Sequence, residues 1–270
     1  MRKHSIGFIG VGKMGSAIAS AVRKQEVDAD FYFNSAPSDY LTDFAKQMSA
    51  SICDKESLIN QSEVIFIGVK PKDIQGVMNE IKGFVSEKEP KLWISMATGV
   101  DLALLTSLLP KHHKVIRIMP NTPVAVGQGY IAYCINEAVK QADVVLFEKL
   151  LACAGLIEPV EESLFDATSA ITGCGPAYMY LVMEALSDGG VKNGLSRQQA
   201  NRMAQQLLIG AGHLAQESNQ HFGQLKDDVC SPAGSTIAGQ ASLEAHGVRS
   251  AFIHAVDAAV ERTKEIAQSL

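Results

Sequence analysis

The chain has 270 residues, of which 47% are hydrophobic, and a formal net charge of −5 at pH 7. This composition excludes disordered and fibrous proteins, and the length allows two modest domains with substantial cores. Because no run of Lys or Arg is present, we expect neither nucleic acid nor an anionic membrane surface as a partner. Small-molecule ligands are expected instead.

The cysteine and hydropathy patterns indicate a cytoplasmic protein without a metal site. The five cysteines show neither C-x-x-C spacing nor pairing with histidines, so reduced thiols are expected in place of disulfides or a zinc site. The adjacent His112 and His113 are expected in a solvated turn. The longest uncharged run, between Arg117 and Glu137, contains prolines and glycines, so no membrane-spanning segment is expected.

Short apolar strands alternate with helical stretches from Ser5 to about Pro159. This rhythm is typical of repeated β-α units around a mostly parallel sheet. The expected strands cover residues 6–9, 31–33, 64–69, 92–97, 115–119 and 130–135. The expected helices cover residues 13–25, 39–46, 72–81, 102–109 and 138–152.

After about Ser163 the strand pattern stops, and four helical segments are expected. One follows Pro176 to residue 187, one follows a capping box at Ser196 and Gln199 to residue 217, and Gly247 separates the last two. The sequence therefore predicts an α/β chain: an N-terminal Rossmann-type dinucleotide-binding domain, residues 1–162, followed by an all-α domain, residues 163–270.

The first helix of the all-α domain is unusually apolar. Residues 177–186 carry only Glu184 as a charge, and a helix that is apolar almost all round has to be buried on most sides. We expect it to form a subunit interface as well as part of the intrachain core. The alternative is that it lies at the centre of its own helical bundle.

A glycine-rich loop, Gly10-x-Gly12-x-x-Gly15, follows the first expected strand and opens a helix. In that context the glycines permit close approach of a pyrophosphate, and the unpaired N–H groups of the helix start favour an anion. The sequence predicts a dinucleotide site, and a structural turn is the alternative. The expected cofactor contacts here are Ile9, Gly10, Gly12, Lys13 and Met14.

The end of the second strand bears on which dinucleotide is bound. An acidic residue about 20 residues past the glycine loop would bind the adenosine ribose of NAD. Asn34 and Ser35 stand there, and a neutral pair tolerates a 2′-phosphate that a carboxylate would repel. NADPH is therefore expected in preference to NADH, although no arginine is present to hold the phosphate.

The ends of three further strands are expected to lie near the cofactor, because ligands collect at the carboxyl edge of open α/β sheets. The alternative for each segment is a strand that proline or glycine simply ends. The expected contacts are Val69, Lys70 and Pro71 after one strand, Met96, Ala97 and Thr98 after the next, and Asn121 after the third.

A second loop, from Ser231 to Thr236, precedes another expected helix. Its small residues and proline bring backbone amides to a helix start, which suits a small anion. Capping by Ser235 is the alternative, and the residues by themselves leave both interpretations open.

Six segments occur in the order seen in pyrroline-5-carboxylate reductases, and the chain resembles that family over its whole length. They are Gly7-Phe8-Ile9-Gly10-Val11-Gly12-Lys13-Met14-Gly15, Val69-Lys70-Pro71, Met119-Pro120-Asn121-Thr122-Pro123, Thr172-Gly173-Cys174-Gly175-Pro176-Ala177-Tyr178, Asp188-Gly189-Gly190-Val191 and the segment from Ser231 to Ile237. The glycine loop is shared with many dehydrogenases, whereas the Gly-Pro-Ala-Tyr and Ser-Pro-x-Gly-x-Thr segments together are far more specific.

The resemblance implies reduction of the cyclic imine L-1-pyrroline-5-carboxylate to L-proline, with hydride from NADPH or NADH. It implies that Gly234 and Ser235 hold the substrate carboxylate through backbone amides. Thr236, the implied catalytic residue, hydrogen-bonds the ring nitrogen, and Val229 also contacts the substrate. A cyclic imine needs little added acid, so positioning and electrostatics are expected to dominate catalysis.

The family likeness also implies a homodimer through the helical domain, an active site shared between subunits, and dimers assembled into larger rings. Four residues depart from the family pattern: Cys174 replaces a serine, Asp54 and Asp228 replace asparagines, and Ala233 replaces a glycine. The rival hypotheses are a 3-hydroxy acid dehydrogenase, whose lysine is missing from residues 176–187, and a non-enzymatic dinucleotide sensor.

Overall fold

The computed structural model describes residues 3–268. Contacts divide them into two units: residues up to Gly173 together with those from Val260 onward, and the segment Cys174–Ala259. The domain boundary expected between residues 162 and 163 stays a prediction, and the two units are described separately.

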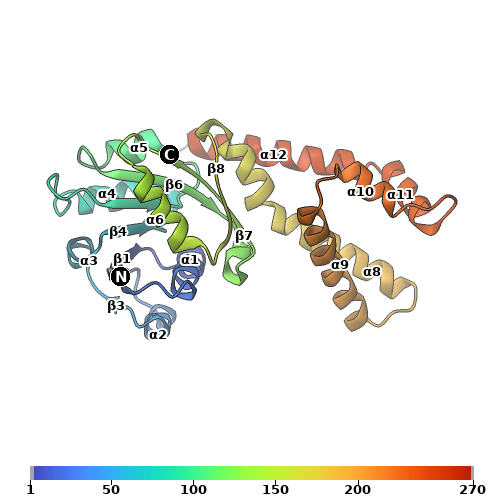
Figure 1. Cartoon of the computed structure of the whole chain (residues 1–270), viewed down its shortest axis with the longest axis horizontal. Helices are drawn as coiled ribbons and strands as arrows, with labels where there is room; N and C mark the ends of the chain where they lie inside the picture. The colour runs from blue at the N-terminus through green and yellow to red at the C-terminus, as the bar shows by residue number, and fades with distance from the viewer. Residues whose placement is uncertain (1–2, 269–270) are drawn as a thin grey trace. The chain divides into compact units, whose positions relative to one another are not determined.

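The first unit is built on an eight-stranded sheet of order β3-β2-β1-β4-β5-β6-β7-β8 (Figure 1). All neighbouring strands are parallel except β6 and β7. The first six positions follow the order of a doubly wound dinucleotide-binding fold. The strands are β1 His4–Ile9, β2 Ala29–Asn34, β3 Ser51–Ile52, β4 Val64–Ile67, β5 Leu92–Ser95, β6 Lys114–Pro120, β7 Gly129–Ile135 and β8 Gly155–Pro159.

The six strands expected from the sequence are all present, and two further strands at the sheet edges were not expected. β3 has only two residues, both exposed, and none of the five residues of β8 is buried. Edge strands contact one neighbour only, so they lack the continuous apolar run that marks a central parallel strand.

Helices cover both faces of the sheet, and the side chains of each strand alternate between the two. Phe8 and Phe66 point to the face covered by α1, α2 and α6, while Ile9 and Trp93 point to the face covered by α3, α4 and α5. The helices are α1 Lys13–Lys24, α2 Asp39–Met48, α3 Lys55–Gln61, α4 Ile74–Ile81, α5 Leu102–Ser107 and α6 Gln141–Leu151. Only α3 was not expected.

The histidine pair departs from the expected solvated turn at one position. His113 is 2% exposed: its Nδ1 accepts from Trp93 Nε1 at 3.0 Å and from Lys91 N at 3.2 Å, and its Nε2 faces Ser86 O at 3.1 Å. Burial lowers the pKa of His113, because the buried ring lacks the water that would stabilise its charged form. The neutral ring therefore links three segments, whereas His112 is exposed.

The second unit is helical, and α8 and α9 lie side by side within it (Figure 1). The capping box at Ser196 and Gln199 is present, with Gln199 N donating to Ser196 Oγ at 3.3 Å. α10 is an additional short helix that the sequence analysis did not predict. The helices after the sheet are α7 Phe165–Thr168, α8 Gly175–Lys192, α9 Arg197–Glu217, α10 Phe222–Asp228, α11 Ser235–Ala245 and α12 Val248–Gln268.

The apolar helix α8 is not covered by its own chain. Of its residues only Ser187 is buried, and Tyr180 and Leu181 are 61% and 66% exposed. The alternative of a helix at the centre of its own bundle is therefore wrong. Ser187 fixes α8 to α9, because its hydroxyl lies 2.6 Å from Asn201 Oδ1 and accepts from Arg197 at 2.8 Å.

Residues 3–268 contain neither a candidate membrane span nor a candidate metal cluster. No helix there combines the length and apolarity needed to cross a membrane. No group of three or more His, Cys, Asp or Glu side chains in that part of the chain is placed to hold a metal ion.

Candidate functional site: a dinucleotide pocket and a helix-start loop

A pocket of about 680 Å³ lies in the first unit, at the carboxyl ends of β1, β2 and β4. The strand order reverses between β1 and β4, which is where ligands bind in open α/β sheets. The lining residues that the sequence predicted are Ile9, Gly10, Gly12, Asn34, Ser35, Val69 and Lys70; the others are Ala36, Lys55, Gly68, Lys72, Asp73 and Val77.

Each of the three glycines in the loop is required for a different structural reason. Gly10 has a φ of +92°, and a Cβ there would lie 2.7 Å from Gly68 C. A Cβ at Gly15 would lie 2.4 Å from Gly10 O, so this glycine allows the helix to pack on the strand. Around Gly12, by contrast, no atom lies within 4 Å of such a Cβ. Gly12 therefore keeps open the space that a pyrophosphate needs, and the loop fits a dinucleotide.

The helix start beside Gly12 offers free donors. Gly12 is the N-cap of α1 and makes no side-chain cap hydrogen bond. Lys13 and Met14 occupy the first turn, where N–H groups lack intrahelical partners and the macrodipole is positive. Both predicted residues thus lie at the anion-binding end of α1, although neither lines the pocket.

Hydrogen bonds fix the end of β2 beside the pocket. Gly10 N donates to Asn34 O at 2.7 Å, and Asn34 Nδ2 donates to Cys53 O at 2.8 Å. Asp54 then caps α3 by accepting from Ser57 N at 2.7 Å, and these hydrogen bonds from Ser57 lower the pKa of the Asp54 carboxyl. The Asp54 carboxylate is therefore engaged in capping.

Three lysines and one aspartate give the pocket wall a positive balance: Lys55, Lys70, Lys72 and Asp73. Lys55 was not predicted as a site residue because it belongs to α3, a helix that was not expected. Asp54 as N-cap, with the acidic Glu56 in the first turn, is a helix-start signal that would have located α3.

The remaining predicted cofactor residues lie outside the pocket lining. Pro71 begins a 3-10 turn, and Met96 and Ala97 are buried at the end of β5. Thr98 Oγ1 lies 3.9 Å from Met119 Sδ.

Asn121, the last predicted cofactor residue, has both ends of its side-chain amide engaged. Its Nδ2 donates to Thr172 O at 3.0 Å, and its Oδ1 accepts from Tyr130 N at 2.9 Å. These contacts connect the end of β6 to β7 and to the segment before α8. A direct role for Asn121 toward a cofactor stays a prediction.

The second loop, in the helical unit, ends in a helix start without a side-chain cap. Gly234 is the N-cap of α11, and no side chain caps this helix. Ser235 is the first helical residue, so Ser235 does not act as the N-cap of α11. Ser235 and Thr236 are exposed, and Val229, at the end of α10, is 65% exposed. The loop thus presents backbone N–H groups and two hydroxyls together.

The loop is tightly turned at Ala233 and Gly234. Gly234 N donates to Ser231 O at 3.0 Å, and a Cβ on Gly234 would lie 2.2 Å from Ser231 Oγ. Ala233 has a φ of +55°, in the left-handed region that favours glycine. A glycine at this position, which the family resemblance implies, would adopt this backbone conformation without strain.

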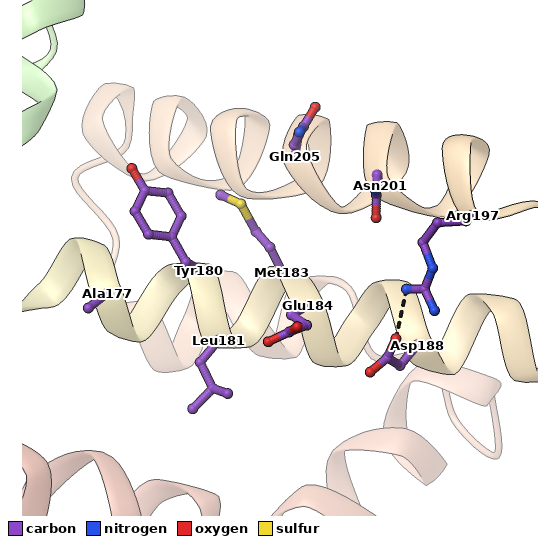
Figure 2. Close-up of a pocket in the computed structure, with 9 residues that line it drawn as sticks. All are labelled: Ala177, Tyr180, Leu181, Met183, Glu184, Asp188, Arg197, Asn201 and Gln205. Atoms are coloured by element: carbon purple, nitrogen blue, oxygen red, sulfur yellow. Dashed lines mark ion pairs between the residues drawn. The ribbon is translucent and has the colours of Figure 1, made fainter.

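A different cavity, of about 880 Å³, lies between α8 and α9 (Figure 2). Figure 2 shows Tyr180 and Met183 directed toward α9, Leu181 directed away from it, and Arg197 paired with Asp188 at 2.7 Å. The cavity has no glycine loop in its lining, and its walls combine the exposed apolar side chains of Tyr180 and Leu181 with polar groups of α8 and α9.

Comparison with known proteins gives a consistent result over the whole chain. Residues 162–266 match the family model described as pyrroline-5-carboxylate reductase dimerisation, and residues 5–99 match the one described as NADP oxidoreductase coenzyme F420-dependent. The pyrroline-5-carboxylate reductase of Methanosarcina acetivorans is 35% identical, over 98% of this chain and 99% of that protein. The chain belongs to the pyrroline-5-carboxylate reductase family.

Solved structures of pyrroline-5-carboxylate reductases agree with this. The reductase of Coxiella burnetii has a TM-score of 0.89 and 33% identity, with 98% of each chain covered. The reductase of Plasmodium falciparum, solved with NADP bound, has a TM-score of 0.86 and 33% identity, with 99% of each chain covered. The predicted family and the predicted fold class, a Rossmann-type domain followed by a helical dimerisation domain, are both confirmed.

Proposed function

We propose that this chain reduces L-1-pyrroline-5-carboxylate to L-proline, with NADPH preferred over NADH. The observation that carries the proposal is the pairing of a glycine-formed dinucleotide pocket in one unit with an uncapped, hydroxyl-bearing helix start in the other. When bound, NADPH or NADH supplies the hydride for the imine carbon. The NADP bound by the Plasmodium falciparum relative supports the choice of cofactor.

The first unit holds the cofactor through its backbone. The N–H groups at the start of α1 face the pyrophosphate, and Gly12 leaves room for it. Lys70 and Lys72 add positive charge to the pocket wall, and neither has an ion-pair partner within residues 3–268. Asn34 and Ser35 leave the ribose end without a repelling carboxylate.

The second unit holds the substrate. The N–H groups of Ser235 and Thr236 bind the substrate carboxylate at the positive end of α11, and Gly234, whose own N–H donates to Ser231 O, shapes the turn that presents them. The Thr236 hydroxyl orients the ring nitrogen and relays a proton from solvent water to this nitrogen as its carbon accepts hydride. Val229 contacts the ring from the end of α10. Fixed donors of this kind accelerate reaction by positioning and by stabilising charge.

The exposed apolar side chains of the helical unit support a homodimer, and the match to a dimerisation domain agrees. Assembly of dimers into larger rings belongs to the same proposal. The five cysteines, all free, support a reducing cytoplasmic location.

Oxidation of NADPH and NADH in the presence of the cyclic imine tests the reaction. We expect turnover with L-1-pyrroline-5-carboxylate and none with a keto acid or an open-chain imine, which serve as controls. Absence of turnover with the cyclic imine, in protein that still binds NADPH, would refute the proposal.

Replacement of Thr236 tests its assigned role. Thr236→Ala should lower kcat at least about tenfold, since a positioned hydroxyl at the reacting nitrogen is lost. Cofactor affinity, measured by NADPH fluorescence, should not change. Thr236→Ser keeps the hydroxyl and should retain most of the rate. Equal rates for the alanine variant and the parent would remove Thr236 from the mechanism.

A further inference from the structure

Lys55 lies on the rim of the dinucleotide pocket near the end of β2. It is the first residue of α3 and lines the pocket together with Asn34 and Ser35. The hydrogen bond from Asn34 Nδ2 to Cys53 O, 2.8 Å long, ties the residues just before Lys55 to this strand end. In dinucleotide folds the end of the second strand faces the adenosine ribose, where NADPH carries its 2′-phosphate. Lys55 is therefore placed at the end of the pocket where the two cofactors differ.

Lys55 has a partner that is not part of the pocket wall. Its Nζ lies 2.6 Å from Oε2 of Glu80, on α4, and Glu80 does not line the pocket. The Lys55 side chain is 30% exposed and that of Glu80 is 61% exposed. An ion pair this exposed is weak, whereas a phosphate carries more charge and more acceptor oxygens than a carboxylate. The pair is thus readily exchanged.

We infer that Lys55 discriminates NADPH from NADH by exchanging the Glu80 carboxylate for the 2′-phosphate. The inference rests on the proposed use of NADPH and NADH by this chain. With NADH, Lys55 keeps its contact with Glu80 and adds little to affinity. With NADPH, it gains a stronger acceptor and loses a weaker one. Glu80 therefore limits the preference for NADPH, and Lys55 supplies the positive charge that no arginine in the pocket wall provides.

The other two lysines of the pocket have a different role. Lys70 and Lys72 follow β4, and neither pairs with a carboxylate in the described part of the chain. Their charges attract the pyrophosphate, which NADPH and NADH share, so they raise both affinities together. Asp73, next to Lys72, offsets part of that charge. Lys72 is thus a matched control for Lys55: the same side chain in the same pocket, at a different end.

The test is the ratio of the Kd for NADH to the Kd for NADPH, measured by cofactor fluorescence in titrations without substrate. Lys55→Met should lower this ratio about tenfold, the effect of losing one charge-assisted contact. Lys55→Arg should restore most of it. Lys72→Met should weaken both cofactors and leave the ratio within about twofold.

Glu80→Gln tests whether the Glu80 carboxylate limits the preference for NADPH. Its effect on the ratio of the two Kd values should be opposite to that of Lys55→Met. Without the competing carboxylate the ratio should rise about threefold. Thermal melts show whether each variant is folded, and neither side chain is buried. A ratio that stays constant in Lys55→Met and in Glu80→Gln overturns the inference, as does an equal fall in the ratio for Lys72→Met. These titrations contain no imine, so a failure of turnover with pyrroline-5-carboxylate would refute the proposed function alone.

Discussion

The two units place their large apolar side chains in opposite environments. In the sheet unit Phe8, Phe66 and Trp93 are at most 1% exposed, whereas in the helical unit Leu181 and Leu207 are 66% and 56% exposed. A sheet covered by helices on both faces closes its own core. The helical unit exposes many large apolar side chains, which supports the proposal that a second subunit covers them.

A charge on the apolar surface of α8 should have the largest effect. Leu181→Asp would bury an unpaired carboxylate in the proposed dimer interface, at a cost of about 3 kcal/mol or more. Light scattering should then show monomers at micromolar concentration, where the parent is at least a dimer. Val145→Asp is the matched control, because Val145 is 54% exposed on α6 of the sheet unit. A stable Leu181→Asp dimer would contradict the assigned interface.

The glycine loop allows stability and cofactor binding to be separated within the sheet unit. Gly10→Ala meets backbone atoms at 2.7 Å with a φ of +92°, and should lower the free energy of unfolding by about 3 kcal/mol. Gly12→Ala has no neighbour within 4 Å, and should fold normally yet bind NADPH about tenfold more weakly. Thermal melts and NADPH titrations measure the two effects, and a cofactor affinity unchanged in Gly12→Ala would contradict the assignment.

The buried His113 predicts that the sheet unit loses stability in mild acid. Burial lowers its pKa in the folded state, so the unfolded chain takes up the proton first. The contribution of the neutral His113 ring to the free energy of unfolding is fully present above the pKa of the unfolded state, about 6.5. It is lost as the pH falls toward the pKa of the folded state, by at most about 1.4 kcal/mol per pH unit.

Urea unfolding at pH 7.5 and 5.5 measures this effect. His113→Gln should flatten the pH dependence, whereas His112→Asn should leave it as in the parent, since His112 is exposed. An equally steep pH dependence in His113→Gln would assign the effect to other groups.

The smallest expected effect is at the loop before α11. Ala233→Gly relieves the left-handed backbone at φ +55° but adds freedom to the unfolded chain, for a net gain of about 0.5 kcal/mol. Ala238→Gly, inside α11, should instead cost about 1 kcal/mol. Differential scanning calorimetry gives both values, and a loss of stability in Ala233→Gly would show that the alanine is unstrained.

The strands and the glycine loop were predictable because their signals are local. A strand buried on both faces is a continuous apolar run, as in β4, and a glycine triplet between a strand and a helix has few other uses. β3 and β8 were not predicted because edge strands bury few apolar side chains. α3 escaped because its seven residues show too little periodicity, and Lys55 was missed with it.

Other site assignments depend on contacts between distant parts of the chain. Asn121 follows a strand at the ligand-binding edge, but its amide is engaged by Tyr130 and Thr172. His113 looked like part of a solvated turn, yet it lies against Trp93 in the core. Hydrogen-bond partners of this kind are set by the approach of segments that no local pattern encodes.

By itself the sequence determined the alternation of strands and helices, the dinucleotide loop, the second helix start and the likeness to pyrroline-5-carboxylate reductases. Those properties follow from short-range spacing and backbone chemistry. Only the tertiary structure decided that Gly234, not Ser235, ends the second loop, that Lys55 reaches the cofactor pocket with Glu80 as its partner, and that α8 is left uncovered. Each of these depends on contacts between segments that are distant in the sequence. Such contacts decide which side chains are buried and which charges pair, and no local pattern encodes them.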